Sequence, residues 1–405
     1  MTPRTSRRAA LAAFALVATT VSPAVTASAA STTGSARSEK AVCARPAAGF
    51  ASCHAHVATK GDGITPHATT SYASGYTPAQ LKAAYRLAPG AAPLIAIVDA
   101  YAHPSAATDL AVYRNQFGLG TASLTQVNQA GGSIGTVAGN TGWGQEEMLD
   151  LEMASAICTA CPILYVGANS ASFADLAAAV NTAAAKGAKV ISNAYGGSES
   201  AGVATYASAY SHPGVAITVS SGDSGYGVQS PASYGTVTAV GGTSLTLNTD
   251  STRKAETVWS GAGSGCSGYI GKPTWQKDRA CSKRTVADVS AVADPATGVA
   301  VYDSYGSTGG ANWYVFGGTS VAAPIIGAVY ALSGNTAGTP ASLAYTSAPG
   351  TLFDVTSGSN GRCVHGQTTS AAYLCTGTAG LTAYNGTFGY DGPTGIGTPK
   401  GTAGF

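Results

Sequence analysis

The chain has 405 residues, of which 53 are glycine and only 10% carry a charge. Lys and Arg total 21 and Asp and Glu total 19, so the formal net charge is +2. This balance lacks the basic excess that nucleic-acid and membrane-surface proteins use, so we expect neither kind of partner.

The N-terminus has the pattern of a secretory signal peptide. Three arginines, at positions 4, 7 and 8, precede an uncharged stretch over 9–21 and a small-residue cleavage site at 27–29. We therefore expect residues 1–30 to be removed on export, and the product to be a secreted, extracellular monomer. No later stretch has the roughly 18 apolar residues that a membrane-spanning helix needs.

Residues 31–75 are rich in Ser, Thr, Ala and Gly and have no periodicity, which is typical of a short pro-segment or linker. From Tyr76 the character changes, and we expect one domain over 76–405. The chain has eight cysteines, an even number that favours disulfides in an exported protein. Local spacing suggests four pairs: Cys43–Cys53, Cys158–Cys161, Cys266–Cys281 and Cys363–Cys375.

Apolar runs alternate with helical patterns along this domain. The patterns predict helices over 77–85, 106–117, 145–157, 173–185 and 201–210. They predict strands over 94–98, 163–166, 189–194 and 215–219. Because the strands are continuously apolar and separated by helices, we predict an α/β fold, with a mostly parallel sheet covered by helices on both faces.

Residues 317–324, Gly-Gly-Thr-Ser-Val-Ala-Ala-Pro, form a small-residue turn that leads into an apolar helix. Two glycines allow a sharp bend, and Pro324 is tolerated in a first helical turn. Ser320 would then combine a hydroxyl nucleophile with a free backbone N–H at the positive end of the helix dipole. Alternatively, Thr319 or Ser320 simply caps a buried helix.

Two carboxylates share the apolar face of the predicted helix over 145–157. At about 100° per residue, Glu146 and Asp150 lie about 40° apart among apolar positions, whereas Glu147 and Glu152 lie on the flanks. Burying such a pair costs several kcal/mol unless it is compensated, which favours a catalytic role. Alternatively, acidic residues simply favour the first turn of a helix.

Asp223, in Ser-Gly-Asp-Ser-Gly, directly follows the strand predicted over 215–219. The carboxyl ends of parallel strands are where active sites gather in such folds. A protonated Asp223 would donate a hydrogen bond to an oxyanion. Alternatively, the Asp223 side chain simply forms a hydrogen bond with the backbone of its own turn.

With these motifs, the chain over about 76–399 resembles the sedolisins, the serine-carboxyl peptidases. The resemblance implies a subtilisin-like fold and peptide or protein substrates. It implies that Ser320 is the nucleophile, Glu146 the general base, Asp150 the residue that orients Glu146, and Asp223 the oxyanion-hole acid. It further implies a calcium ion bound by two carboxylates and three backbone oxygens, at Asp354, Val355, Thr387, Gly389 and Asp391. Family members usually carry a long pro-domain, for which residues 31–75 leave little room.

Two other functions remain open. A neutral subtilisin-type serine protease would use Asp99, His103 and Ser320, although His103 lies in an expected turn before Pro104. A secreted, non-catalytic binding protein would keep the fold without the chemistry. An activity optimum near neutrality would favour the first alternative, and inactivity on peptides at acid pH the second.

Overall fold

The structure is a computed structural model that describes residue 1 and residues 38–279, 281–307, 310, 312–361, 373–377 and 389–405. The chain divides into two units, Met1–Ala36 and Arg37–Phe405. The predicted signal peptide, apart from Met1, lies outside the described residues.

The central element of this unit is a sheet with eight strands among the described residues. Its order is β12-β11-β9-β7-β4-β6-β5, and β15 also pairs with β11. All neighbours pair in parallel except β12, which is antiparallel to β11. The strands are β4 (Ile95–Ala100), β5 (Leu124–Asn128), β6 (Ile163–Ala168), β7 (Val190–Asn193), β9 (Ala216–Ser220), β11 (Thr238–Leu247), β12 (Arg253–Val258) and β15 (Val289–Val292).

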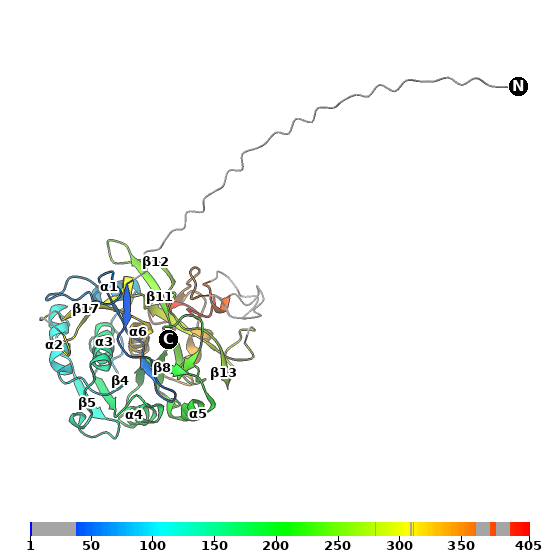
Figure 1. Ribbon diagram of the computed structural model, residues 1–405. Helices are drawn as coiled ribbons and strands as arrows, with labels where there is room; N and C mark the ends of the chain where they lie inside the picture. Colours follow the sequence, from blue (N-terminus) through cyan, green and yellow to red (C-terminus); the bar gives the residue numbers. More distant parts are fainter. Residues whose placement is uncertain (2–37, 280, 308–309, 311, 362–372, 378–388) are drawn as a thin grey trace. The chain divides into compact units, whose positions relative to one another are not determined.

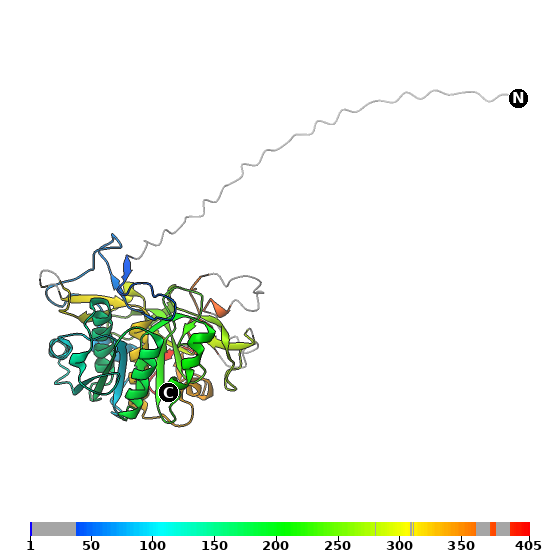
Figure 2. The ribbon, with the colours of Figure 1, turned by 60° about the horizontal axis from the view of Figure 1, so that its bottom comes forward.

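Helices cover both faces of this sheet (Figures 1 and 2). Ile95 and Ile97 of β4 belong to the core cluster that contains residues of α3 and α6, whereas Ala96 and Val98 belong to the cluster with α4. This alternation is what a strand buried on both sides requires. The helices are α1 (Pro78–Ala84), α2 (Ala106–Gln116), α3 (Thr141–Ile157), α4 (Phe173–Ala185), α5 (Ala201–Ala204), α6 (Thr319–Ser333) and α7 (Leu343–Thr346).

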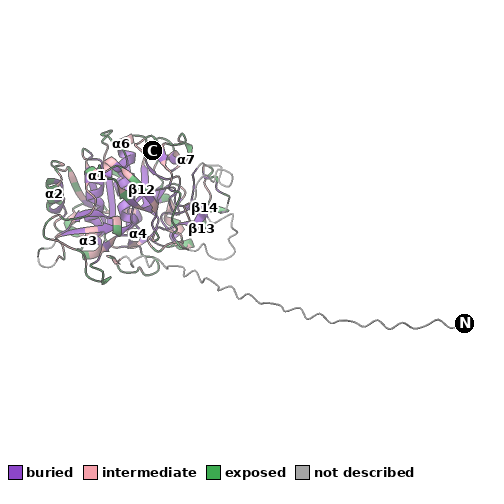
Figure 3. Cartoon of the chain, turned by 90° about the horizontal axis from the view of Figure 1, so that it is seen from above, coloured by how far each residue is buried: buried purple, intermediate pink, exposed green. Residues whose placement is uncertain are grey.

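The predicted α/β class, with a mostly parallel sheet between helices, is confirmed. Figure 3 shows the consequence for burial: α6 lies among purple, buried elements, whereas α2 carries green, exposed residues. All but the last residue of α6, Ser333, are buried, since one side packs on the sheet and another on α3. The start of α6 is thereby held rigidly at the carboxyl edge of the sheet.

Residues 38–75, within the predicted pro-segment or linker, contribute strands to the unit. β1 (Glu39–Ala41) and β3 (His56–Ala58) join β17 (Trp313–Gly317) and β16 (Val299–Tyr302) in a four-stranded sheet. β2 (Ser52–Cys53) pairs with β8 (Tyr195–Ser198), which also pairs with β10 (Gln229–Ser230). In Figure 1 this blue segment runs beside β8 and β17. The remaining strands are β13 (Gly265–Gly271), β14 (Lys283–Val286), β18 (Leu352–Phe353) and β19 (Thr398–Pro399).

Three predicted disulfides are confirmed: Cys43–Cys53, Cys158–Cys161 and Cys266–Cys281. Cys375 is also disulfide-bonded. Cys363 lies outside the described residues, so its pairing with Cys375 stays a prediction. Among the described residues, no helix is both long and apolar enough to cross a membrane.

Candidate active site

The candidate nucleophile lies where β17 passes into α6. Gly318 precedes the helix with φ of 98°, a left-handed conformation that favours glycine. α6 begins at Thr319, so Ser320 lies in its first turn with a backbone N–H that has no partner within the helix. That N–H donates to the His54 carbonyl at 3.4 Å, and the Ser320 hydroxyl donates to the Ala194 carbonyl at 3.1 Å.

Pro324 lies one turn further into α6 than the sequence predicts. The helix starts at Thr319, so Pro324 is in the second turn rather than the first. A proline there has no N–H to donate to the carbonyl four residues earlier, which belongs to Ser320. The first turn of α6, which contains Ser320, therefore lacks one helical hydrogen bond. Pro324 is tolerated because the other residues of α6 are packed in the core.

Glu146 and Asp150 both lie on α3 and are fully buried. Glu147 and Glu152, which were expected on the flanks of this face, are buried as well, because α3 is covered on nearly all sides from Trp143 onwards. These two acids have backbone partners: Glu147 accepts from the His103 N–H at 2.7 Å, and Glu152 accepts from the Tyr302 N–H at 3.0 Å. Neither Glu146 nor Asp150 has a carboxylate oxygen with a hydrogen-bond partner of normal geometry among the described residues.

Burial raises the pKa of Glu146 well above its usual range, and the nearby Asp99 carboxyl raises it further. The Ser320 hydroxyl and the Ala55 backbone N–H act in the opposite direction, which places both groups beside this carboxyl. Burial, Asp99 and Glu146 likewise raise the pKa of Asp150. These effects place Ser320, Glu146 and Asp150 in one cluster, in which burial opposes the ionised form of both carboxyls.

Asp99 is a third acid in this cluster, which sequence reasoning considered only for a different mechanism. It occupies the carboxyl end of β4, is fully buried, and burial raises its pKa to about 8. Both its oxygens lack hydrogen-bond partners among the described residues. Its position at the carboxyl end of a buried apolar strand was the signal that could have assigned it to the Glu146–Asp150 pair.

Asp223 lies in the loop after β9 and faces the start of α6. Its Oδ1 accepts from the Thr319 N–H at 2.9 Å and from the Thr319 hydroxyl at 2.6 Å. These bonds lower its pKa, but burial outweighs them and raises it to about 8. Asp223 Oδ2 is buried without a hydrogen-bond partner among the described residues, and His56 Nε2 lies 3.5 Å away.

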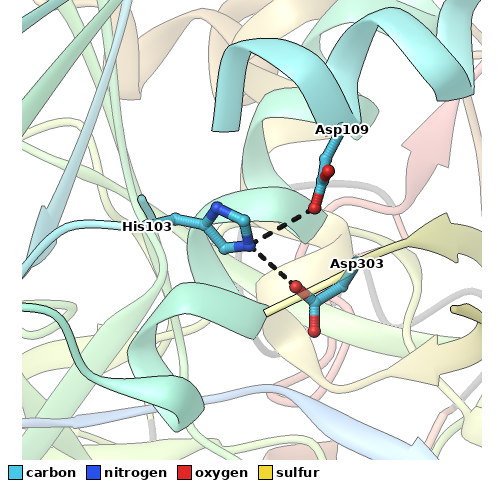
Figure 4. Close-up of side chains that lie close together, drawn as sticks. All are labelled: His103, Asp109 and Asp303. Carbon is cyan, nitrogen blue, oxygen red and sulfur yellow. Dashed lines mark hydrogen bonds and ion pairs between the residues drawn. The ribbon is translucent and has the colours of Figure 1, made fainter. Parts of the chain in front are cut away.

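His103 belongs to a different cluster, shown in Figure 4. Its Nε2 lies 2.8 Å from Asp303 Oδ1 and 3.5 Å from Asp109 Oδ2, and its Nδ1 accepts from the Ser105 N–H at 3.0 Å. These described contacts occupy both ring nitrogens, and none of them is to Ser320. The cluster instead ties the loop before α2 to the loop after β16, which does not favour the Asp99–His103–Ser320 alternative.

A cleft of about 670 Å³ opens beside Asp223. It is lined by the Asp223 loop, by Gly196 and Gly197 of β8, and by Cys53, His54 and His56 of the N-terminal segment. One wall of the cleft therefore consists of residues from the stretch predicted to be a pro-segment or linker.

The residues predicted to bind calcium lie near the C-terminus. Gly389 lies against the Asp354 carboxyl, since a Cβ at Gly389 would come within 3.0 Å of both carboxylate oxygens. Asp354 Oδ1 is buried without a hydrogen-bond partner among the described residues, and Val355 is fully buried. Asp391 accepts from the Thr394 N–H and hydroxyl at 3.0 and 2.9 Å. Thr387 lies outside the described residues.

No protein-family model matches the chain. It is 32% identical to sedolisin from Pseudomonas sp. (strain 101) over 218 residues, which are 46% of this chain and 33% of that protein. It is 30% identical to kumamolisin from Bacillus sp. (strain MN-32) over 291 residues, which are 62% of this chain and 51% of that protein. The chain thus spans about a third to a half of the length of these two curated relatives.

Among solved structures, the chain matches Pseudomonas sedolisin, a serine-carboxyl proteinase complexed with two molecules of pseudo-iodotyrostatin. The TM-score is 0.68 with 26% sequence identity, and the match covers 82% of this chain and 96% of that one. This similarity confirms the expected subtilisin-like fold. With the two sequence matches, it shows that the chain is similar to the sedolisins in sequence and in fold.

Proposed function

We propose that this protein is a serine-carboxyl peptidase that hydrolyses peptide bonds in peptides or proteins. One observation carries this proposal: the Ser320 hydroxyl and the buried Glu146 carboxyl lie side by side, while the Ser320 N–H faces a peptide carbonyl. A hydroxyl, a base and an oxyanion donor are the three groups that acyl transfer needs. The similarity to sedolisin in sequence and fold supports the same activity.

In this mechanism, Glu146 takes the Ser320 proton while Ser320 Oγ attacks the substrate carbonyl carbon. The proton then passes from Glu146 to the leaving amine, and an acyl-enzyme remains on Ser320. Water activated by Glu146 hydrolyses this ester and restores the serine. Asp150 positions Glu146 and shares its proton, as the effect of the Glu146 carboxyl on the pKa of Asp150 supports.

The oxyanion that forms on the carbonyl needs hydrogen-bond donors. The Ser320 N–H is one donor, and a protonated Asp223 Oδ2 is the other. With a pKa of about 8, Asp223 is protonated throughout the acid range and loses its proton only above neutrality. Activity below the pKa of Asp223 is therefore what this site supports, because Asp223 must stay protonated. The raised pKa of Glu146 sets the acid limb of the profile, because the base must be ionised to take the Ser320 proton.

We also propose a calcium ion near the C-terminus, held by the carboxylates of Asp354 and Asp391 with backbone oxygens of Val355, Thr387 and Gly389. The partnerless Asp354 Oδ1 and the close approach of Gly389 support this donor set. Carboxylate and carbonyl oxygens are the ligands that Ca²⁺ prefers. The ion would fix the C-terminal loops rather than take part in the reaction.

The signal-peptide pattern and the disulfides support secretion, with the protein acting as an extracellular monomer.

A test of the function is digestion of a defined peptide library across pH 3 to 8, with products identified by mass spectrometry. We expect new peptide termini at acid pH from the wild type and none from Ser320→Ala. Equal product formation by both proteins would contradict the proposal.

A further inference from the structure

The His54 carbonyl lies where the carbonyl that Ser320 attacks would lie. It accepts from the Ser320 N–H at 3.4 Å. A Cβ at Gly318 would lie 1.8 Å from this oxygen and 2.7 Å from Asp223 Oδ2, so the second oxyanion donor is close to it as well. The His54 side chain therefore lies where the enzyme would hold the side chain of the residue whose carbonyl is attacked, which we call the acyl-side residue.

The backbone around His54 runs as a strand added to β8. β2 pairs antiparallel with β8, and the His54 N–H donates to the Ala194 carbonyl at 3.1 Å. Extended peptides commonly bind to a strand edge in this way. Because side chains alternate at a fixed spacing along an extended strand, a substrate on the same edge would place its acyl-side residue in the same pocket.

Three residues from three strands surround the His54 ring. Ser220 is the last residue of β9, and its hydroxyl lies 2.6 Å from Nδ1. Gln229 is the first residue of β10, and its Oε1 lies 2.9 Å from Nε2. A Cβ at Gly196 of β8 would lie 2.8 Å from the ring and 2.8 Å from Gln229 Oε1. The pocket thus offers one polar partner to each ring nitrogen, and Gly196 leaves room for a flat side chain.

These partners are uncharged, so they favour an uncharged ring. When Nε2 donates to Gln229 Oε1, the neutral imidazole accepts from the Ser220 hydroxyl at Nδ1. Burial lowers the pKa of His54 to about 4; the Gln229 bond opposes this effect, and nearby His56 adds to it.

The charged residues that line the cleft do not offset a positive charge on the ring. Glu199 is hydrogen-bonded to β13, and Asp223 is hydrogen-bonded to the start of α6. Arg45 and His56 also line the cleft, and both disfavour a further positive charge there. The pocket is therefore built for a polar side chain without charge.

We propose that Ser220, Gln229 and Gly196 make the enzyme selective for peptides whose acyl-side residue is a histidine with an uncharged ring. This inference rests on the proposed function. A phenyl ring would fill the same flat space but leave the Ser220 hydroxyl and Gln229 Oε1 without partners. A lysine ammonium would bring a charge that nothing in the pocket compensates.

The test compares peptides of one sequence that differ only in the acyl-side residue, which is His, Phe or Lys. The full chain is held at pH 5 until its rate of peptide hydrolysis is constant. Values of kcat/KM are then measured at pH 6.5, with the cut position identified by mass spectrometry. We expect kcat/KM for the His peptide to exceed the other two by about a hundredfold or more, because a site built for hydrogen bonds rejects side chains that cannot make them.

The pH dependence provides a second readout. The ratio of kcat/KM for the His peptide to that for the Phe peptide should fall about tenfold per pH unit below about pH 6, because a free imidazole gains a proton with a pKa of about 6.5. Gln229→Glu should flatten this fall between pH 6 and 5, because a carboxylate pairs with an imidazolium.

Gln229→Leu should lower kcat/KM for the His peptide about tenfold or more, because one hydrogen bond to the ring is lost. The Phe peptide should be cleaved at least as well as by the wild type. The matched control is Gln116→Leu, the same change at the exposed end of α2, which should behave as the wild type does.

Two results would overturn the inference in distinguishable ways. If the wild type cleaves the three peptides with similar kcat/KM, or if an active Gln229→Leu keeps the His-to-Phe ratio, histidine selectivity is wrong and the proposed function stands. If the folded wild type cleaves none of these peptides and no member of a mixed peptide library, both proposals are wrong. Should Gln229→Leu fail to fold, the ratio in the wild type and its pH dependence still decide the question.

Discussion

At the residue scale, Asp223 shows how burial sets the charge of a single carboxyl. Its two bonds from Thr319 lower the pKa, yet burial raises it to about 8. We expect Asp223→Asn to keep activity at pH 4 and to weaken the fall towards neutrality, because an amide donates at any pH. Asp223→Ala should lose about a hundredfold or more in kcat. Profiles of kcat from pH 3 to 8 test this, and an Asp223→Ala enzyme as active as the wild type would refute the role.

Asp99 allows a second test at this scale. Its carboxyl raises the pKa of Glu146, so Asp99→Asn should shift the acid limb of the kcat profile to lower pH. Glu152→Gln is the matched control, since Glu152 lies on the same helix as Glu146 but accepts from the Tyr302 N–H. An acid limb that stays in place in Asp99→Asn, or moves equally in both variants, would remove Asp99 from the cluster.

At the element scale, the sequence predicts well those long helices whose ends are marked by local signals such as capping residues. The limits of α4 match those predicted, because Ser172 caps its start and Gly187, with φ of 90°, follows its end. α3 begins at Thr141 rather than Gln145, because Asn140 caps it before the apolar pattern starts. The helix predicted over 201–210 is instead the short α5 followed by a 3₁₀ turn over Thr205–Tyr210.

Elements that depend on distant partners were not predicted. β5 reads Leu-Thr-Gln-Val-Asn and lies at the sheet edge, so it lacks the continuous apolar pattern of the inner strands. β1, β2 and β3 have two or three residues each and exist because β8 and β17 offer them backbone partners. No local pattern marks such pairing, which explains why residues 38–58 gave no strand signal.

The C-terminal loops provide a test of the proposed calcium site. If Asp354 and Asp391 bind an ion that the unfolded chain does not, chelation should lower the melting temperature of the wild type. Asp391→Ala should make the melting temperature insensitive to chelator. Differential scanning calorimetry with and without chelator measures this. A wild-type melting curve that chelator leaves unchanged would count against the site.

At the scale of the whole molecule, the buried acids make stability depend on pH. Asp99 and Asp223 have folded-state pKa values of about 8, so in the native state they keep protons that the unfolded chain releases. Their stabilising effect is complete below the unfolded pKa of about 4 and is lost as pH rises through about 8. His54 and His56, with pKa values lowered to about 4, oppose this trend only below about pH 6.5.

We therefore expect the melting temperature of Ser320→Ala, used to avoid self-digestion, to fall as pH rises from 6.5 to 8. Adding Asp99→Asn and Asp223→Asn should flatten this dependence, because amides do not titrate. Thermal unfolding monitored by circular dichroism measures both effects. A melting temperature that rises over this range would mean that these carboxyls are ionised in the native state.

The overall architecture and the candidate site were predictable to different degrees. Continuous apolar strands between helices indicated the parallel sheet, and the motifs around Ser320, Glu146, Asp150 and Asp223 indicated residues that the fold brings together. The sequence did not indicate that His54 lies at Ser320, because this contact joins segments 266 residues apart through backbone atoms alone. Backbone contacts leave no side-chain pattern to detect.

The most direct test of the central claim is the pH dependence of peptide hydrolysis by the wild type, Ser320→Ala and Glu146→Gln, with the intact mass of each protein recorded alongside. We predict highest wild-type activity in the acid range, at least about a thousandfold lower kcat in Ser320→Ala, and a strong loss in Glu146→Gln. A wild type most active at pH 8, with Glu146→Gln fully active, would contradict the serine-carboxyl mechanism.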